Sequence, residues 1–199
     1  MSEQEITASG NPDTPGDRSV SLLAANFLMV FFALPAVLIL GGVYAWIWGA
    51  HRFVWALQGN YLAHVVAVLA GIVAHEAIHG LTWKIVARKP AGAITFGMNW
   101  KLLTPYAHCR EPMTTRAYRI GAVMPLLLLG LLPALVGIAG GQPAVMLFGL
   151  FFTFAAGGDM LILWLLRGVP ATALVEDHAE RAGCRVVGAA PATPPDTLV

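Results

Sequence analysis

Four apolar stretches run along this 199-residue chain, and each is long enough to cross the roughly 30 Å hydrocarbon core of a bilayer as a helix. They cover residues 21–48, 61–86, 117–139 and 143–166. Composition agrees, because 57% of the residues are hydrophobic and only 12% are charged. The sequence therefore predicts an α-helical polytopic membrane protein with about four transmembrane helices. Its partners should include the lipid bilayer and no nucleic acid, because a basic, aromatic-rich surface is lacking.

The basic residues indicate how these spans are oriented. With four crossings, both termini and the connection between the second and third spans lie on one side of the membrane. That side carries eleven of the twelve Lys and Arg residues, and only Arg52 falls on the other. By the positive-inside rule, we expect a multi-pass protein of the cell (inner) membrane with its N-terminus and C-terminus in the cytoplasm.

Residues 75–79, inside the second span, read His-Glu-Ala-Ile-His, which is an HExxH pattern. On a helix, His75 and His79 project from the same face and can bind one zinc ion, while Glu76 can take a proton from a zinc-bound water. Ionisable residues are costly in apolar helices and are usually kept there for a function. The motif predicts one Zn²⁺ per chain, with His75 and His79 as ligands and Glu76 as the catalytic base.

A third ligand must come from another part of the chain, because a catalytic zinc takes three protein ligands and leaves a fourth position for water. Besides Glu76, the spans and their connections contain only two acidic residues, Glu111 and Asp159. Glu111 falls in the basic connection, where a solvated charge is ordinary. Asp159 lies roughly 12 Å and His79 roughly 8 Å from the basic edge, so they share a depth. We expect Asp159 to be the ligand, with Gly157-Gly158 letting the fourth span approach the second. The alternative is an aspartate that is protonated or held by a neighbouring helix.

The connection between the second and third spans has a strand pattern, because apolar residues occupy every second position over 94–102. We expect a short membrane-associated β-hairpin with its turn near residues 99–104. A strand edge beside the motif can pair with an extended substrate, which makes Phe96, Met98 and Asn99 candidate substrate-binding residues. The alternative is a hairpin that only caps the helical bundle.

Three further histidines and two cysteines carry atoms that can bind a metal. His108 is a candidate substrate-binding residue, either as a spare ligand or as a hydrogen-bond donor in the transition state; the alternative is an incidental loop histidine. His64 lies three helical turns before the motif, so a structural or path-lining role is expected. Cys109, Cys184, His108 and His178 hold the right atoms for a second zinc site, but their spacing matches no ligand pattern.

The motif residues also resemble a known group of proteins. Residues 75–80 and the later Gly158-Asp159 pair resemble the site-2 protease group of intramembrane zinc metalloproteases, and more closely the small putative zincin peptidases of bacterial membranes. The resemblance extends over residues 60–187. It implies that the two motif histidines and Asp159 bind zinc and that Glu76 is the general base. The residues around Asp159 read Gly-Gly-Asp-Met and so differ from the Leu-Asp-Gly sequence that is common around this aspartate in site-2 proteases.

Together these observations predict three regions: a disordered cytoplasmic tail (1–20), a membrane metalloprotease-like domain (21–167) and a largely irregular cytoplasmic tail (168–199). The expected activity is hydrolysis of peptide bonds within or near the cytoplasmic face, in a membrane protein or peptide substrate. A non-proteolytic zinc-binding scaffold or chaperone is the main alternative, although such a protein would be expected to have lost Glu76. A metal transporter would need more ligands along a crossing path, where only His64 is available.

Overall fold

The computed structural model describes residues 16–100, 104–178 and 181–189. In that part of the chain, four helices are long and apolar enough to cross a membrane, as the hydropathy predicts. Their bounds lie within two residues of the expected ones at each end: Leu22–Trp48, Tyr61–Val86, Thr115–Gly140 and Pro143–Leu165. Of the disordered tail expected over residues 1–20, residues 1–15 lie outside the described residues, whereas Asp17–Val20 form a strand and so differ from that expectation.

Two of the four long helices are divided into shorter elements. The third span contains a π-helical segment, η3, and the fourth breaks at Ala156. In chain order the helices are α1 (Leu22–Trp48), α2 (His51–Leu57), α3 (Tyr61–Val86), the short η2 (Ala91–Ala93), α4 (Thr115–Pro125), η3 (Leu126–Leu131), α5 (Leu132–Gly140), α6 (Pro143–Ala155) and α7 (Gly157–Leu165).

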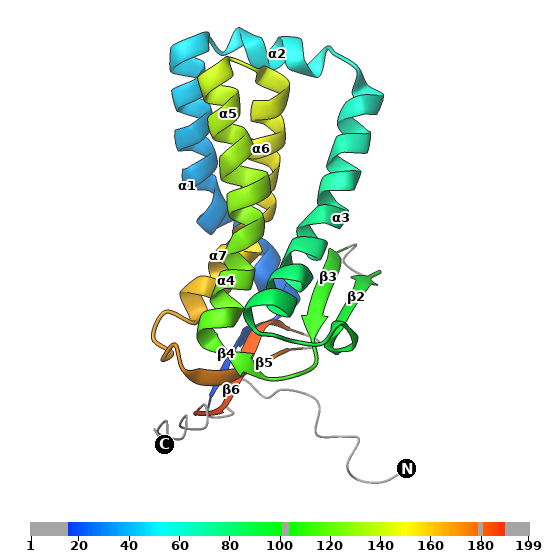
Figure 1. Ribbon diagram of the computed structural model, residues 1–199. Coiled ribbons are helices and arrows are strands. Elements are labelled where there is room, and N and C mark those ends of the chain that lie inside the picture. Colours follow the sequence, from blue (N-terminus) through cyan, green and yellow to red (C-terminus); the bar gives the residue numbers. More distant parts are fainter. Residues whose placement is uncertain (1–15, 101–103, 179–180, 190–199) are drawn as a thin grey trace, which may run out of the picture.

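Figure 1 shows α2 lying across one end of the bundle, which we name the far end, and the strands gathered at the other, the sheet end. Near the far end α5 packs closely on α6. Gly137 permits this approach, since a Cβ added to it would lie 2.8 Å from the Cα of Met146. Arg52, the one basic residue expected on this side, donates from Nη1 to the carbonyl oxygen of Gly141 at 3.1 Å. It therefore caps the carboxyl end of α5.

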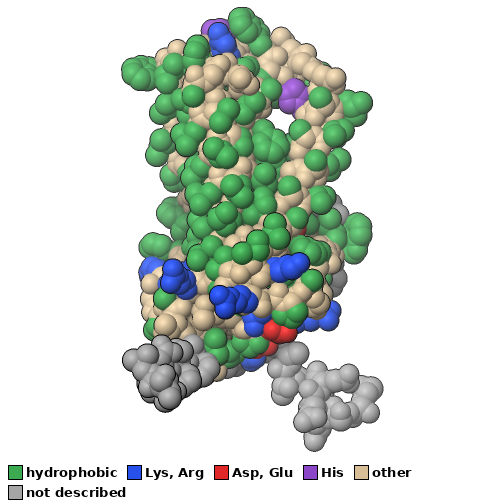
Figure 2. All heavy atoms as spheres, in the orientation of Figure 1, with side chains coloured by type: hydrophobic (Ala, Val, Ile, Leu, Met, Phe, Trp, Pro, Cys, Tyr) green, Lys and Arg blue, Asp and Glu red, His purple; other side chains and the backbone are tan. Residues whose placement is uncertain are grey.

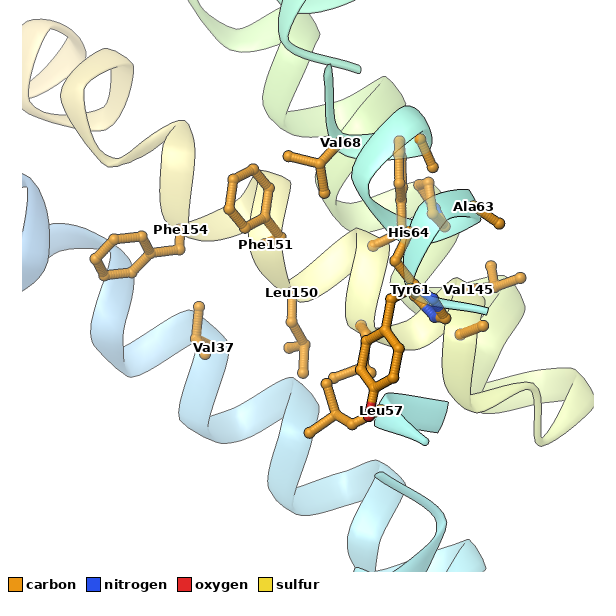
Figure 3. Close-up of a pocket in the computed structure, with 15 residues that line it drawn as sticks. Val37, Leu57, Tyr61, Ala63, His64, Val68, Val145, Leu150, Phe151 and Phe154 are labelled. Atoms are coloured by element: carbon orange, nitrogen blue, oxygen red, sulfur yellow. The ribbon is translucent and has the colours of Figure 1, made fainter. Parts of the chain in front are cut away.

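The upper half of α3 stands away from the other helices (Figure 1). An apolar cavity of about 970 Å³ lies between them, lined by side chains that include Val37, His64, Phe151 and Phe154 (Figure 3). Nδ1 of His64 lies 2.8 Å from the carbonyl oxygen of Asn60, the residue that caps the N-terminus of the same helix. His64 therefore belongs to this apolar cavity and is held by its own helix.

The hairpin predicted between the second and third spans is confirmed. Strands β2 (Ile94–Asn99) and β3 (Thr104–Cys109) pair antiparallel, with Phe96 opposite Ala107. The hairpin packs on α3, where a Cβ added to Gly80 would lie 2.6 Å from the ring of Phe96. Gly80 follows the HExxH motif directly, so its lack of a side chain brings the hairpin against the motif.

A second, four-stranded antiparallel sheet covers the sheet end, and part of it differs from the irregular C-terminal tail that the sequence led us to expect. Its strand order is β1-β6-β5-β4. The strands are β1 (Asp17–Val20), β4 (Met113–Thr114), β5 (Ala173–Asp177) and β6 (Ala182–Ala189). Val175 and Cys184 are fully buried, in a core that also contains Trp83 and Tyr118. β1 and β4 pair with strands that are far away in sequence, so no local pattern predicts those two pairings.

Candidate metal centre

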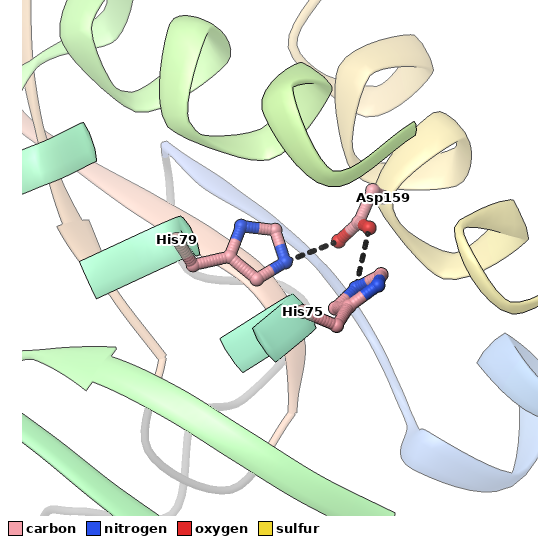
Figure 4. Close-up of side chains that lie close together, drawn as sticks. All are labelled: His75, His79 and Asp159. Atoms are coloured by element: carbon pink, nitrogen blue, oxygen red, sulfur yellow. Dashed lines mark ion pairs between the residues drawn. The ribbon is translucent and has the colours of Figure 1, made fainter. Parts of the chain in front are cut away.

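Three side chains from two spans converge at the sheet end of the bundle. His75 and His79 project from α3, and Asp159 projects toward them from α7 (Figure 4). Nε2 of His75 lies 3.2 Å from Oδ2 of Asp159, and Nε2 of His79 lies 3.3 Å from Oδ1. The three ligand atoms lie within 4.8 Å of one another, and all three side chains are largely shielded from solvent.

This donor set fits zinc. Two ligands bound tetrahedrally at about 2.0–2.1 Å lie about 3.3 Å apart, which is the separation of each imidazole nitrogen from the carboxylate. Oδ2 of Asp159 is buried and has no hydrogen-bond partner, because its contact with His75 lacks hydrogen-bond geometry. The lone pair of a neutral imidazole repels a carboxylate oxygen that faces it. A cation between the two groups removes this repulsion, because both groups then bind the cation.

The backbone of α4 orients His79. Nδ1 of His79 lies 2.9 Å from the carbonyl oxygen of Gly121 and donates its hydrogen to it, which leaves the lone pair on Nε2 for a metal. The indole of Trp83 stacks between His79 and Tyr118, with ring centroids 5.6 Å away on each side. A Cβ at Gly121 would clash with the Trp83 indole. Gly121 therefore lets α4 approach closely enough to hold this ligand.

A helix break places Asp159. The fourth span ends one helix at Ala155 and begins the next at Gly157, so Asp159 lies in the first turn of α7. A carboxylate is favoured there by the partial positive charge of the helix N-terminus. The expected role of the preceding glycines was wrong: a Cβ at Gly157 would lie 3.0 Å from Ala33 of α1, so Gly157 brings α7 against the first span.

A cavity of about 240 Å³ surrounds the metal centre and is lined by several parts of the chain. The Glu76 carboxylate lines it and lies close to the backbone amide of Ala107 on β3. Its other lining residues include His75, His79, Trp83, Pro105, His108, Tyr118, Gly158, Asp159, Asp177, His178 and Gly183. The HExxH span, the hairpin, α7 and the C-terminal strands therefore all contribute to one site.

The comparison with protein families agrees with this chemistry. A sequence model of the family described as putative zincin peptidase matches residues 68–174, which is just over half of the chain. The chain belongs to this family. No curated protein and no solved structure matches it. Zincins are zinc enzymes by name, so the family supports zinc as the ion for His75, His79 and Asp159.

In this zincin the four predicted substrate-binding residues separate into two groups. His108, on β3, lines the metal cavity. Phe96, Met98 and Asn99 lie on β2 and do not line it. The ring of Phe96 packs on Gly80, and 58% of the residue is exposed.

Sequence reasoning did not identify Asp177 and Tyr118, which both line the cavity of the candidate metal centre. Nδ1 of His108 donates to Oδ2 of Asp177 at 2.8 Å, and the Tyr118 hydroxyl donates to Oδ1 at 2.8 Å. The hydrogen bond to Asp177 raises the pKa of His108 above 6.5, although burial acts in the opposite direction. Asp177 is 69 residues from His108, so only the folded chain brings them together.

The structure does not support a second zinc site formed by Cys109, Cys184, His108 and His178. Among the residues that the structure describes, His75, His79 and Asp159 form the one group with metal-ligand spacing. Cys109 and Cys184 are fully buried in the hydrophobic core. Burial raises the pKa of both thiols, that of Cys184 to about 12. Both cysteines therefore act as small apolar core residues.

Proposed function

We propose that this zincin-family protein is an intramembrane zinc metallopeptidase that hydrolyses peptide bonds within or near the cytoplasmic face of the membrane. The observation that carries the proposal is the convergence of His75, His79 and Asp159 at zinc spacing, in a cavity that Glu76 also lines. Family membership supports the same reaction class. A non-proteolytic scaffold needs no carboxylate beside the metal ligands, so Glu76 favours the enzyme.

Zinc bound by His75, His79 and Asp159 would supply Lewis acidity, which lowers the pKa of a water to about 7 and polarises the scissile carbonyl. Glu76 accepts the proton of the attacking water and then delivers it to the leaving amine. One C–O bond forms and the C–N bond breaks, so one water is consumed and a carboxylate and an amine are released. Burial of the His75, His79 and Asp159 side chains keeps bulk water away from these proton transfers.

The distribution of charge supports a cytoplasmic site. In Figure 2 the visible Lys and Arg side chains gather around the sheet end, below the apolar helices, and a separate basic side chain marks the far end. The metal centre lies toward the sheet end of α3, where Lys84 is in the last turn. With the sheet end in the cytoplasm, both chain ends face the cytoplasm, as the positive-inside rule requires, and water reaches the metal cavity from that side.

The proposed substrate is a membrane protein or peptide presented as an extended segment. A spanning helix hides its carbonyl groups in hydrogen bonds, so it must unwind before Glu76 and the metal can act on one. The hairpin offers a strand edge for such a segment, with Phe96, Met98 and Asn99 on β2 as outer contacts and β3 beside the metal cavity. One zinc ion per chain is sufficient for this chemistry.

Purified full-length protein tests the proposed function. It should contain about one zinc per chain and cleave a mixture of detergent-soluble apolar peptides, with heavy oxygen from labelled water appearing in the new carboxyl termini. Glu76→Gln should keep the zinc and lose cleavage, because the amide cannot accept the proton. Cleavage by Glu76→Gln at the wild-type rate, or a zinc-loaded wild type that incorporates no label, would contradict the proposal and favour the scaffold.

A further inference from the structure

His108 reaches the metal cavity from β3 and is held in place by a carboxylate of the C-terminal sheet. It comes from a different element than the HExxH span. Its side chain is 19% exposed, so it is partly shielded and still open to the cavity. The metal ligands and Glu76 do not use it, which leaves its chemistry unassigned.

Asp177, the hydrogen-bond partner of His108, is held in place by several hydrogen bonds. The Asp177 carboxylate accepts hydrogen bonds from His108 Nδ1 at 2.8 Å, from the Tyr118 hydroxyl at 2.8 Å and from the backbone N–H of Cys109 at 3.4 Å. Tyr118 is itself buried on α4 and stacks on Trp83, which stacks on the ligand His79. The orientation of the His108 ring is therefore tied to the same packed core that orients the metal ligand.

We propose that His108 donates a hydrogen bond from Nε2 to the oxygen of the scissile carbonyl as negative charge develops there, and that Asp177 is its positioning residue. Nδ1 is committed to Asp177, so the opposite edge of the ring is the one left to meet a substrate in the cavity. His108 keeps its proton throughout, and Glu76 carries the proton that moves. This inference rests on the proposed peptidase function and adds the donor that complements the metal.

The donor role requires a hydrogen on Nε2, which His108 has only as an imidazolium when Nδ1–H is bound to Asp177. The hydrogen bond to Asp177 raises the pKa of His108, while burial and Arg110 lower it. The ionisable groups around it belong to several elements. They are Asp177 and Glu176 on β5, Arg110 after β3, Tyr118 on α4, Glu76, His75 and His79 of α3, Asp159 of α7, and His178 and Arg181 between β5 and β6. A carboxylate partner therefore favours the imidazolium form that the donor role requires.

Two inhibitors distinguish a His108 that donates a hydrogen bond to the substrate from a His108 that has only a structural role. A phosphonamidate tripeptide presents an anionic tetrahedral oxygen, whereas a thiol tripeptide with the same side chains binds the metal without one. His108→Ala should weaken phosphonamidate binding about 100-fold and leave thiol binding and zinc content unchanged. His64→Ala, a matched change in the apolar cavity, should alter none of the three measurements.

Asp177→Asn tests the positioning role. It should lower kcat for peptide cleavage with little change in KM, and Asp177→Glu should restore part of the loss, because it returns a carboxylate to His108. Equal weakening of both inhibitors in His108→Ala would assign it a structural role and overturn the proposal. Unchanged phosphonamidate binding, or a wild type that binds zinc and the thiol but not the phosphonamidate, would also overturn it. A wild type that binds both inhibitors yet cleaves no peptide would instead contradict the peptidase function itself.

Discussion

His79 donates its Nδ1 hydrogen to the backbone carbonyl oxygen of Gly121 across 2.9 Å, and so a candidate metal ligand on α3 is oriented by the main chain of α4. A backbone acceptor cannot be removed by a side-chain substitution. It can only be displaced, and Gly121 is the position where an added side chain would push α4 away from Trp83. The zinc affinity of the centre should therefore depend on a residue that offers no ligand atom.

Gly121→Ala should lower zinc affinity about 10–100-fold, because the clash with Trp83 shifts the acceptor that sets the ring orientation of His79. Competition with a chelator measures this affinity. Gly42→Ala is the matched control, since a Cβ at Gly42 has no atom within 4 Å. Equal zinc affinity in Gly121→Ala and Gly42→Ala would show that the hydrogen bond to Gly121 does not tune the site.

Asp159→Asn should weaken zinc binding by more than about 100-fold, because it replaces the anionic ligand with a neutral amide of the same shape. The zinc content of purified protein, measured after dialysis, provides the test. Glu76→Gln is the natural comparison, since it makes the same chemical change on a residue that we place beside the metal and not on it. Retention of zinc by Asp159→Asn would mean that the third ligand lies elsewhere.

The His108–Asp177 pair should make stability depend on pH. The folded-state pKa of His108 is raised, so the pair contributes its full stabilisation below pH 6.5 and loses it as pH rises through the raised pKa. Wild type should exceed Asp177→Asn by about 1–2 kcal/mol in unfolding free energy at acidic pH, with a smaller difference at alkaline pH. Denaturation followed at both pH values measures this, and a difference that grows with pH would contradict the assignment.

Neither cysteine should react with a water-soluble maleimide while the protein is folded. Cys109 and Cys184 are fully buried, and burial raises the pKa of both thiols, so the reactive thiolate is scarce. Mass spectrometry should find no label on the native protein and two labels after denaturation. Thr172→Cys, at an exposed position near the same sheet, should add one label in the native state and serves as the positive control.

The proposed orientation predicts opposite labelling of the two ends of the bundle. A membrane-impermeant maleimide added to intact cells should label Gln58→Cys, in the exposed connection between α2 and α3 at the far end. Thr172→Cys should react only after the membrane is permeabilised, because it lies at the sheet end with the basic residues. The reverse pattern would place the metal cavity on the outer side.

Much of this architecture is readable from the sequence, because it depends on local patterns. Four apolar runs predict four long helices, since each run has the length that a bilayer demands. Alternation over residues 94–102 predicts the hairpin, which the structure forms as β2 and β3. The four-residue spacing of His75 and His79 places both imidazoles on one helical face, whatever the rest of the chain does.

Only the tertiary structure decided which distant residues complete the site. Asp159 was expected beside the motif because of its depth, but the break at Ala156 and the packing of α7 on α1 put it there. The link between His108 and Asp177 and the bond from Arg181 to Ser19, 162 residues away, have no local signature. Helix length, helical spacing and strand alternation are properties of neighbouring residues. Contacts between remote segments arise from packing the whole chain, and that packing supplies the carboxylates on which the metal centre and its neighbouring histidine depend.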